Sequence, residues 1–200
     1  MNSLEDIILS RRSCRRMKNT PPIPYVDLLR LVFAGVHAPS SNNGQNYRFL
    51  VIDDPAEIAK LSQVKVPARL ASQAAAWIVV VSDDSGHVDI RPDEYHIWSK
   101  LWTQNCAAAI QNILLLATDM GYATCWLSLV KEMDGTRLLS GMTWRSLFAN
   151  YELPQTGSPH GIVLIGHPEF WDGNFPAGDE VHGRRPVKRR PVLDYIIRRR

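Results

Sequence analysis

The chain has 200 residues, 45% of them hydrophobic, and a formal charge of +3. This length and hydrophobic content are enough to form one buried core, so we expect a single domain over residues 1–200. Its longest apolar run, 106–117, contains two amides and is shorter than the roughly 18 residues that a membrane span needs. The acidic N-terminus shows no secretory signal, and three separated cysteines indicate reduced thiols, so we expect a cytoplasmic protein without a membrane partner.

Two helices are expected in the first forty residues. The sequence Ser3–Asp6 is a capping box and predicts a short helix with inward-facing Leu4, Ile7 and Ile8. Pro24 suits the first position of a second helix that ends before Pro39. One apolar stripe recurs along this second helix and predicts its buried face: Leu29, Val32, Phe33 and Val36.

The remaining pattern predicts further strands and helices in mixed order. Apolar and β-branched runs predict four strands, at 49–52, 77–81, 124–129 and 161–166, of which 77–81 is expected to be central. Helices are expected at 56–62, 93–120 and 143–151, with Gly121 ending the long one. The fold class is therefore α+β with one layered core.

Two polar segments follow the first two helices. Four arginines and a serine lie in residues 11–16, and residues 39–45 carry hydroxyl and amide side chains. Guanidinium groups form strong paired hydrogen bonds with phosphate oxygens, so the first segment suits a phosphate-bearing ligand. A solvated arginine surface and ordinary helix-stop chemistry at Pro39 would give the same compositions.

Together with later motifs, these segments resemble the FMN-dependent nitroreductase family. The resemblance rests on motifs in a fixed order along most of the chain: Arg11-Arg12-Ser13-x-Arg15, Ala38-Pro39-Ser40-Ser41-Asn42-Asn43-x-Gln45, Ala109-Ile110-Gln111-Asn112-x-Leu114-Leu115, Gly121-x-x-Thr124-Cys125-Trp126, Ile165-Gly166-His167-Pro168 and Lys188-x-Arg190-Pro191. It implies a central mixed, mainly antiparallel sheet flanked by helices, in an interlocked homodimer.

The resemblance also implies a cofactor site. It places a first group of residues around the FMN phosphate and ribityl chain: Arg11, Arg12, Ser13 and Arg15, with Lys188 and Arg190 from the C-terminal segment. A second group would reach the flavin of the neighbouring subunit: Pro39, Ser40, Ser41, Asn43 and Gln45. Trp126, Leu127 and Ser128 would lie against the flavin ring, with a backbone N–H facing N5.

Some positions depart from the family pattern or lack an assigned role. Asn46 and Tyr47 stand where Pro and Trp are frequent, and Leu129 stands where Gly is common. Lys65 and Arg69 are candidates for a cation near flavin N1 and O2, although the role of a surface charge fits both of them better. The six histidines show no metal-ligand spacing, and no metal is expected.

The implied activity is that of an FMN-dependent NAD(P)H oxidoreductase. NADH or NADPH would deliver a hydride to flavin N5, and a nitroaromatic, quinone or related small-molecule acceptor would then take the electrons in a ping-pong sequence. No side chain is needed as an acid or base, so no catalytic residue is expected.

Three alternatives remain open. A relative of similar fold could perform reductive dehalogenation or flavin cleavage, and a flavin-binding protein without turnover would carry the same cofactor motifs. The basic tail, residues 183–200, carries eight Lys and Arg and one acid, and could bind nucleic acid. Its basic run, residues 184–191, alternates with prolines and lacks interleaved aromatic side chains, so no nucleic-acid partner is expected.

Overall fold

The computed structural model describes residues 3–63, 71–83, 95–128, 147–155 and 157–169, with the backbone alone for 95–100. The helices of these residues are α1 (Leu4–Ser10), α2 (Tyr25–Val36), the 3-10 turn η1 (Ser41–Asn43), α3 (Pro55–Ser62) and α5 (Tyr95–Asp119). The strands are β1 (Met17–Lys18), β2 (Tyr47–Ile52), β3 (Ala76–Ser82), β4 (Ala123–Ser128) and β5 (Pro159–Pro168). No helix in this part of the chain is both long and apolar enough to cross a bilayer.

A five-stranded antiparallel sheet forms the centre of the fold. Strand β5 pairs with β1, β3 and β4, and β3 pairs in turn with β2. The one parallel contact among the described strands is an isolated bridge between Ser13 and Thr124. Every residue of β3 is buried, which confirms that the β-branched run at 77–81 is a central strand. The α+β class is confirmed as well.

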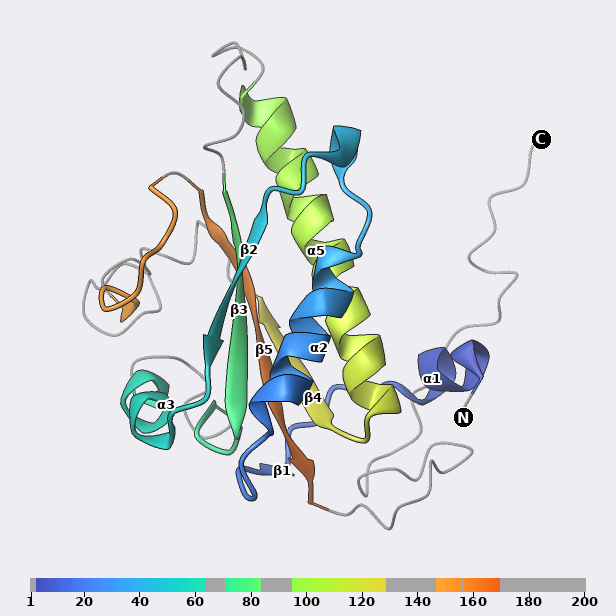
Figure 1. Cartoon of the computed structure of the whole chain (residues 1–200), viewed down its shortest axis with the longest axis vertical. Coiled ribbons are helices and arrows are strands. Elements are labelled where there is room, and N and C mark those ends of the chain that lie inside the picture. Colours follow the sequence, from blue (N-terminus) through green and yellow to red (C-terminus); the bar gives the residue numbers. More distant parts are fainter. Residues whose placement is uncertain (1–2, 64–70, 84–94, 129–146, 156, 170–200) are drawn as a thin grey trace, which may run out of the picture.

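Helices cover both faces of this sheet (Figure 1). Helices α2 and α5 lie side by side on one face, where Leu28, Leu31 and Ile110 pack against Ile78 and Val163. Helix α3 lies on the opposite face (Figure 1), in a second cluster that includes Ile58, Leu61, Trp77 and Leu164. The apolar alternation of β3 and β5 therefore serves two cores, one on each side of the sheet.

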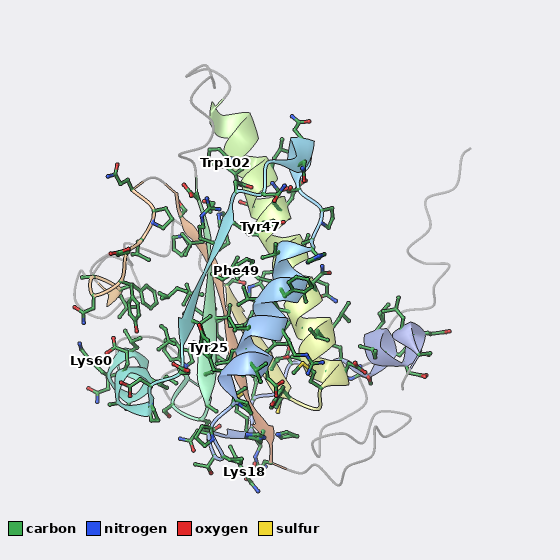
Figure 2. The ribbon with its side chains drawn as sticks, in the orientation of Figure 1. Lys18, Tyr25, Tyr47, Phe49, Lys60 and Trp102 are labelled. Atoms are coloured by element: carbon green, nitrogen blue, oxygen red, sulfur yellow. The ribbon has the colours of Figure 1, made fainter. Side chains whose placement is uncertain are left out.

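The expected buried face of the second helix is wrong. Helix α2 buries Leu28, Leu31 and Gly35, whereas three residues of the expected stripe are exposed: Leu29, Phe33 and Val36. Gly35 explains this orientation, because a Cβ there would lie 2.9 Å from the Phe49 ring on β2 and 3.1 Å from Ile113 on α5. Figure 2 shows Phe49 between β2 and α2. Only a glycine permits this close approach of the helix.

The first helix also faces differently from the expectation. The Ser3 capping box is confirmed, since the Ser3 hydroxyl accepts from the Asp6 amide and the Asp6 carboxylate accepts from the Ser3 amide. However, no residue of α1 is buried, and Leu4 and Ile8, which were expected to face inward, are exposed. Helix α1 thus projects from the side of the molecule near the end of α5 (Figure 1).

Most other expected elements are confirmed with shifted ends. The expected strands 49–52 and 161–166 are longer, as β2 and β5, and α5 ends before Gly121, which has a φ of 80°. The sequence pattern missed β1 and η1, which are too short to show a period. Of the helix expected at 143–151, residues 143–146 lie outside the described residues, and 148–150 form a turn.

Candidate functional site

The segment after α1 is held against the sheet by its backbone. The Cys14 amide donates to the Thr124 carbonyl at 2.7 Å, and Ser13 forms the parallel bridge to the same residue of β4. The Cys14 side chain is buried in the core, while its neighbours Ser13 and Arg15 are both exposed. Because successive side chains of an extended chain point to opposite sides, anchoring Cys14 presents a hydroxyl and a guanidinium to solvent at the start of β4.

The arginines of this segment have different surroundings. The Arg12 Nη1 donates to the carbonyls of Leu9 and Arg11, so part of this guanidinium satisfies the C-terminal end of α1. Arg16 forms an ion pair with Glu169 at 2.8 Å beyond the end of β5. Within the described part of the chain, Arg15 forms no ion pair. We call residues 11–15 the arginine segment.

Beside the arginine segment lies a buried hydroxyl without a partner. Thr124 is 2% exposed, and its Oγ1 makes no hydrogen bond within the described residues. A parallel bridge places Thr124 next to Ser13, and the exposed Ser13 and Arg15 supply further donors there. This donor set of hydroxyl and guanidinium groups fits a phosphate or a polyol chain, both of which accept several hydrogen bonds.

The loop between α2 and β2 has an unusual backbone. Asn42, Asn43 and Gln45 all have a positive φ, of 50°, 54° and 45°. Such conformations cost non-glycine residues about 1 kcal/mol or more each, with asparagine tolerating them best, and they cluster at functional sites. The Gln45 amide donates to Ser40 Oγ at 3.1 Å, and the Gln45 side chain donates to Asn43 Oδ1 at 2.9 Å. We call residues 40–45 the amide loop.

The amide loop is tied to the rest of the molecule by buried polar side chains. The Ser41 amide donates to Asn105 Oδ1 on α5 at 3.0 Å, and Asn105 Nδ2 donates to Asn46 Oδ1 at 3.0 Å. The Tyr47 hydroxyl lies within hydrogen-bond distance of two carbonyls at the end of α2 and can donate to either. The distances are 2.8 Å to Val36 and 3.1 Å to Ala38. Burial raises the pKa of Tyr47, which keeps this hydroxyl a donor. The sequence pattern had not identified Asn105.

The second half of β4 opens toward solvent. Trp126 is 36% exposed, Leu127 is half-buried and Ser128 is exposed. The Trp126 indole lies over Gly161 of β5, where a Cβ would come within 2.3 Å of the indole Nε1. The missing side chain of Gly161 therefore lets the indole approach the backbone of β5 closely, and Trp126 keeps part of its ring exposed.

One chain does not bring the arginine segment and the amide loop together. The amide loop contacts α5 at Asn105, whereas the arginine segment meets β4 just after α5 ends at Asp119. Fourteen helical residues separate these points, which is about 20 Å along the helix. Figure 1 shows η1 and α1 toward opposite ends of α5. Lys65, Arg69, Lys188 and Arg190 lie outside the described residues.

Two titratable groups lie away from both segments. Burial lowers the pKa of His160 on β5 to about 4, so its imidazole is neutral near pH 7. Burial and a 2.6 Å hydrogen bond to Asp27 raise the pKa of Tyr122 to about 12. Neither group makes a hydrogen bond to the arginine segment among the described residues, and we assign neither a role in ligand binding.

Comparison with known proteins gives consistent matches. The sequence pattern described as the Nitroreductase family matches residues 8–83 and 65–166 of this chain. An Archaeoglobus fulgidus protein, named as an NADH dehydrogenase/NAD(P)H nitroreductase, is 27% identical over 179 residues, covering 90% of this chain and 93% of its own. A solved nitroreductase from Desulfovibrio desulfuricans, in complex with FMN, has a TM-score of 0.71 at 24% identity and covers 100% of this chain and 98% of that one. A solved NADH oxidase from Clostridium acetobutylicum has a TM-score of 0.67 at 27% identity, covering 87% and 93%.

Proposed function

We propose, from the premise that this chain belongs to the nitroreductase family, that it is an FMN-dependent NAD(P)H oxidoreductase acting on a small oxidised acceptor. The observation that carries the proposal is the arginine segment, where Ser13 and Arg15 are exposed beside the buried Thr124 hydroxyl, which makes no hydrogen bond among the described residues. The FMN in the Desulfovibrio desulfuricans structure and the cofactor in the name of the Archaeoglobus fulgidus relative support it. A nitroaromatic or quinone is the expected acceptor class.

The chain's own residues would hold the cofactor at one end and leave its ring open. The arginine segment would neutralise the phosphate charge of FMN, with Ser13 and Arg15 as the most accessible donors. Arg11 and Arg12 would add to this grip. The exposed edge of β4, from Trp126 to Ser128, would lie beside the flavin ring and shield part of it from water.

When bound, FMN supplies a ring nitrogen, N5, that takes a hydride from NADH or NADPH and passes it to the acceptor. Both substrates would approach the flavin ring in turn at the exposed end of β4, which is the arrangement of a ping-pong reaction. No acid or base residue is assigned, because the protein's contribution is orientation and electrostatic stabilisation.

We further propose that the working form is a homodimer. Helix α2 exposes a continuous apolar stripe of Val26, Leu29, Phe33 and Val36, which is unusual for a surface facing water. Since the amide loop and the arginine segment of one chain lie about 20 Å apart along α5, the loop would complete the flavin site of a second copy. Pro39, Ser40, Ser41, Asn43 and Gln45 would then contact the partner's flavin.

The test combines spectroscopy with sedimentation of the purified full chain reconstituted with FMN. We expect about one FMN per chain, bleaching of the flavin absorbance by NADH or NADPH without oxygen, and recovery when a quinone is added. The same sample should sediment at twice the chain mass of 22.6 kDa. A chain that binds no FMN, or whose flavin is not bleached by either nucleotide, would refute the enzyme proposal. A monomer with full FMN occupancy would refute the dimer.

A further inference from the structure

Both ends of the amide loop meet one buried side chain on α5. At the beginning of the loop, the Ser41 amide donates to Asn105 Oδ1 at 3.0 Å. Just after its end, Asn46 Oδ1 accepts from Asn105 Nδ2 at the same distance. Asn105 is 6% exposed and Asn46 is 3% exposed, so neither hydrogen bond competes with bulk water. A single amide group therefore clamps the loop across its base.

The loop requires such a clamp because its own backbone is unfavourable. Three positive φ values within four residues are tolerated only where surrounding contacts enforce them. The internal hydrogen bonds, from Asn43 N to Ser40 O and from Gly44 N to Ser41 O, shape the turn and do not fix it to the body of the protein. Asn105 and the Tyr47 hydroxyl supply that attachment.

Asn46 holds the base of the loop through both its side chain and its backbone. Its Oδ1 accepts from Asn105 Nδ2 at 3.0 Å, and the residue is 3% exposed. The Asn46 carbonyl also accepts from the Asp83 amide at 2.6 Å, which joins the loop base to the end of β3. The Asn46 Nδ2 is buried and makes no hydrogen bond within the described residues. Asn46 is therefore placed to reorient its side-chain amide if its partner changes.

We propose that Asn105 is a positioning residue that holds the amide loop in the conformation required for flavin binding. This inference rests on the proposed function, in which the loop contacts FMN, and it assigns the control of that loop to the interior of α5. Asn105 itself acts through Ser41 and Asn46 and does not touch the flavin.

The experiment compares Asn105→Leu and Asn105→Asp with a matched control, Asn112→Leu. Leucine has nearly the shape of asparagine and removes both hydrogen bonds. Aspartate keeps an acceptor for the Ser41 amide, and Asn46 can turn its unpartnered Nδ2 toward the carboxylate. Asn112 is another α5 amide, but its Nδ2 donates to the Ala34 carbonyl on α2 at 3.0 Å and does not reach the loop.

Two quantities are measured on the full chain: the FMN dissociation constant of the apoprotein and hydrogen exchange of the Ser41 amide without flavin. Asn105→Leu should weaken FMN binding about tenfold or more and speed exchange by a similar factor, because a lost buried hydrogen bond is of that size. Asn105→Asp should stay within about threefold of the unmodified chain in both quantities. Asn112→Leu should lower thermal stability and leave both quantities unchanged.

The inference is overturned if Asn105→Leu lowers only the melting temperature, or if the aspartate variant is as impaired as the leucine variant. If Asn105→Leu fails to fold, Asn46→Ala is used instead, because it removes only the hydrogen bond between Asn105 and Asn46. This variant must show faster exchange of the Ser41 amide and weaker FMN binding. Absence of FMN binding by the unmodified chain would refute the proposed function instead. The exchange comparison would still show whether Asn105 holds the loop.

Discussion

The arginine segment and the amide loop achieve order in opposite ways. The arginine segment is positively charged, has no positive φ value and is fixed by backbone pairing to β4 and by the buried Cys14. The amide loop carries no charged side chain, has three positive φ values and is fixed by the buried side chains of Asn105 and Tyr47. In the arginine segment, the candidate binding groups are separate from the residues that anchor it. In the amide loop, the anchoring side chains must offset the strain of the backbone.

This difference separates affinity from stability. Removing exposed groups from the arginine segment leaves every backbone anchor in place, so ligand affinity should change and folding stability should not. Removing an anchor of the amide loop leaves buried carbonyls or amides unpaired, so folding stability should change first. Substitutions in the two regions can therefore test whether affinity and stability are separate.

The largest effect is expected from the double variant Ser13→Ala and Arg15→Ala. Losing a charge-assisted pair and a hydroxyl donor should weaken FMN binding by about a hundredfold or more, because such hydrogen bonds are roughly twice as strong as neutral ones. The free energy of unfolding of the apoprotein should stay within about 0.5 kcal/mol. FMN titration and urea unfolding measure the two quantities.

Arg30→Ala is the matched control for this double variant, since Arg30 is an exposed arginine on α2 paired only with Asp27 at 3.3 Å among the described carboxylates. It should leave FMN affinity unchanged. Unaltered flavin affinity in the double variant would mean that the arginine segment is an ordinary solvated surface.

A smaller effect on binding, with a clear loss of stability, is expected for Tyr47→Phe. The change removes the donor that serves the Val36 and Ala38 carbonyls, one of which is then left buried and unpaired. Unfolding should become easier by about 1–2 kcal/mol, and FMN affinity should fall only a few-fold. Tyr25→Phe, at a tyrosine that is 60% exposed, should change neither. A Tyr47 variant with normal stability but no flavin affinity would show that Tyr47 serves ligand binding and does not anchor the loop.

The sequence alone predicted the arginine segment because charge and spacing are visible without a fold. It could not choose the buried face of α2, since Leu28 and Leu31 on one side and Leu29 and Phe33 on the other are equally apolar. The deciding residue is Gly35, whose missing side chain lets Phe49 approach, and that contact joins residues distant along the chain.

Within the candidate site, the sequence predicted groups that we propose face a ligand, and it missed the groups that hold them in place. The side-chain amide of Asn105 makes two hydrogen bonds, which reach residues 59 and 64 positions away. A polar residue in an apolar helix carries no signal of which loop it contacts. Long-range anchors of this kind follow from tertiary packing and not from local pattern.

The smallest effect is expected from Asn42→Gly, which tests the strain in the amide loop directly. Asn42 has a φ of 50°, a conformation that glycine adopts without steric cost, so relief of strain should offset the greater freedom of the unfolded chain. We expect the free energy of unfolding to change by less than about 0.5 kcal/mol. Asn19→Gly, at an exposed asparagine before α2 with ordinary φ, should be destabilised by about 0.5–1 kcal/mol, because only the entropic cost remains. Equal destabilisation of the two variants in urea unfolding would show that the amide loop stores no strain, and its contrast with the arginine segment would then rest on charge and on the kind of anchor.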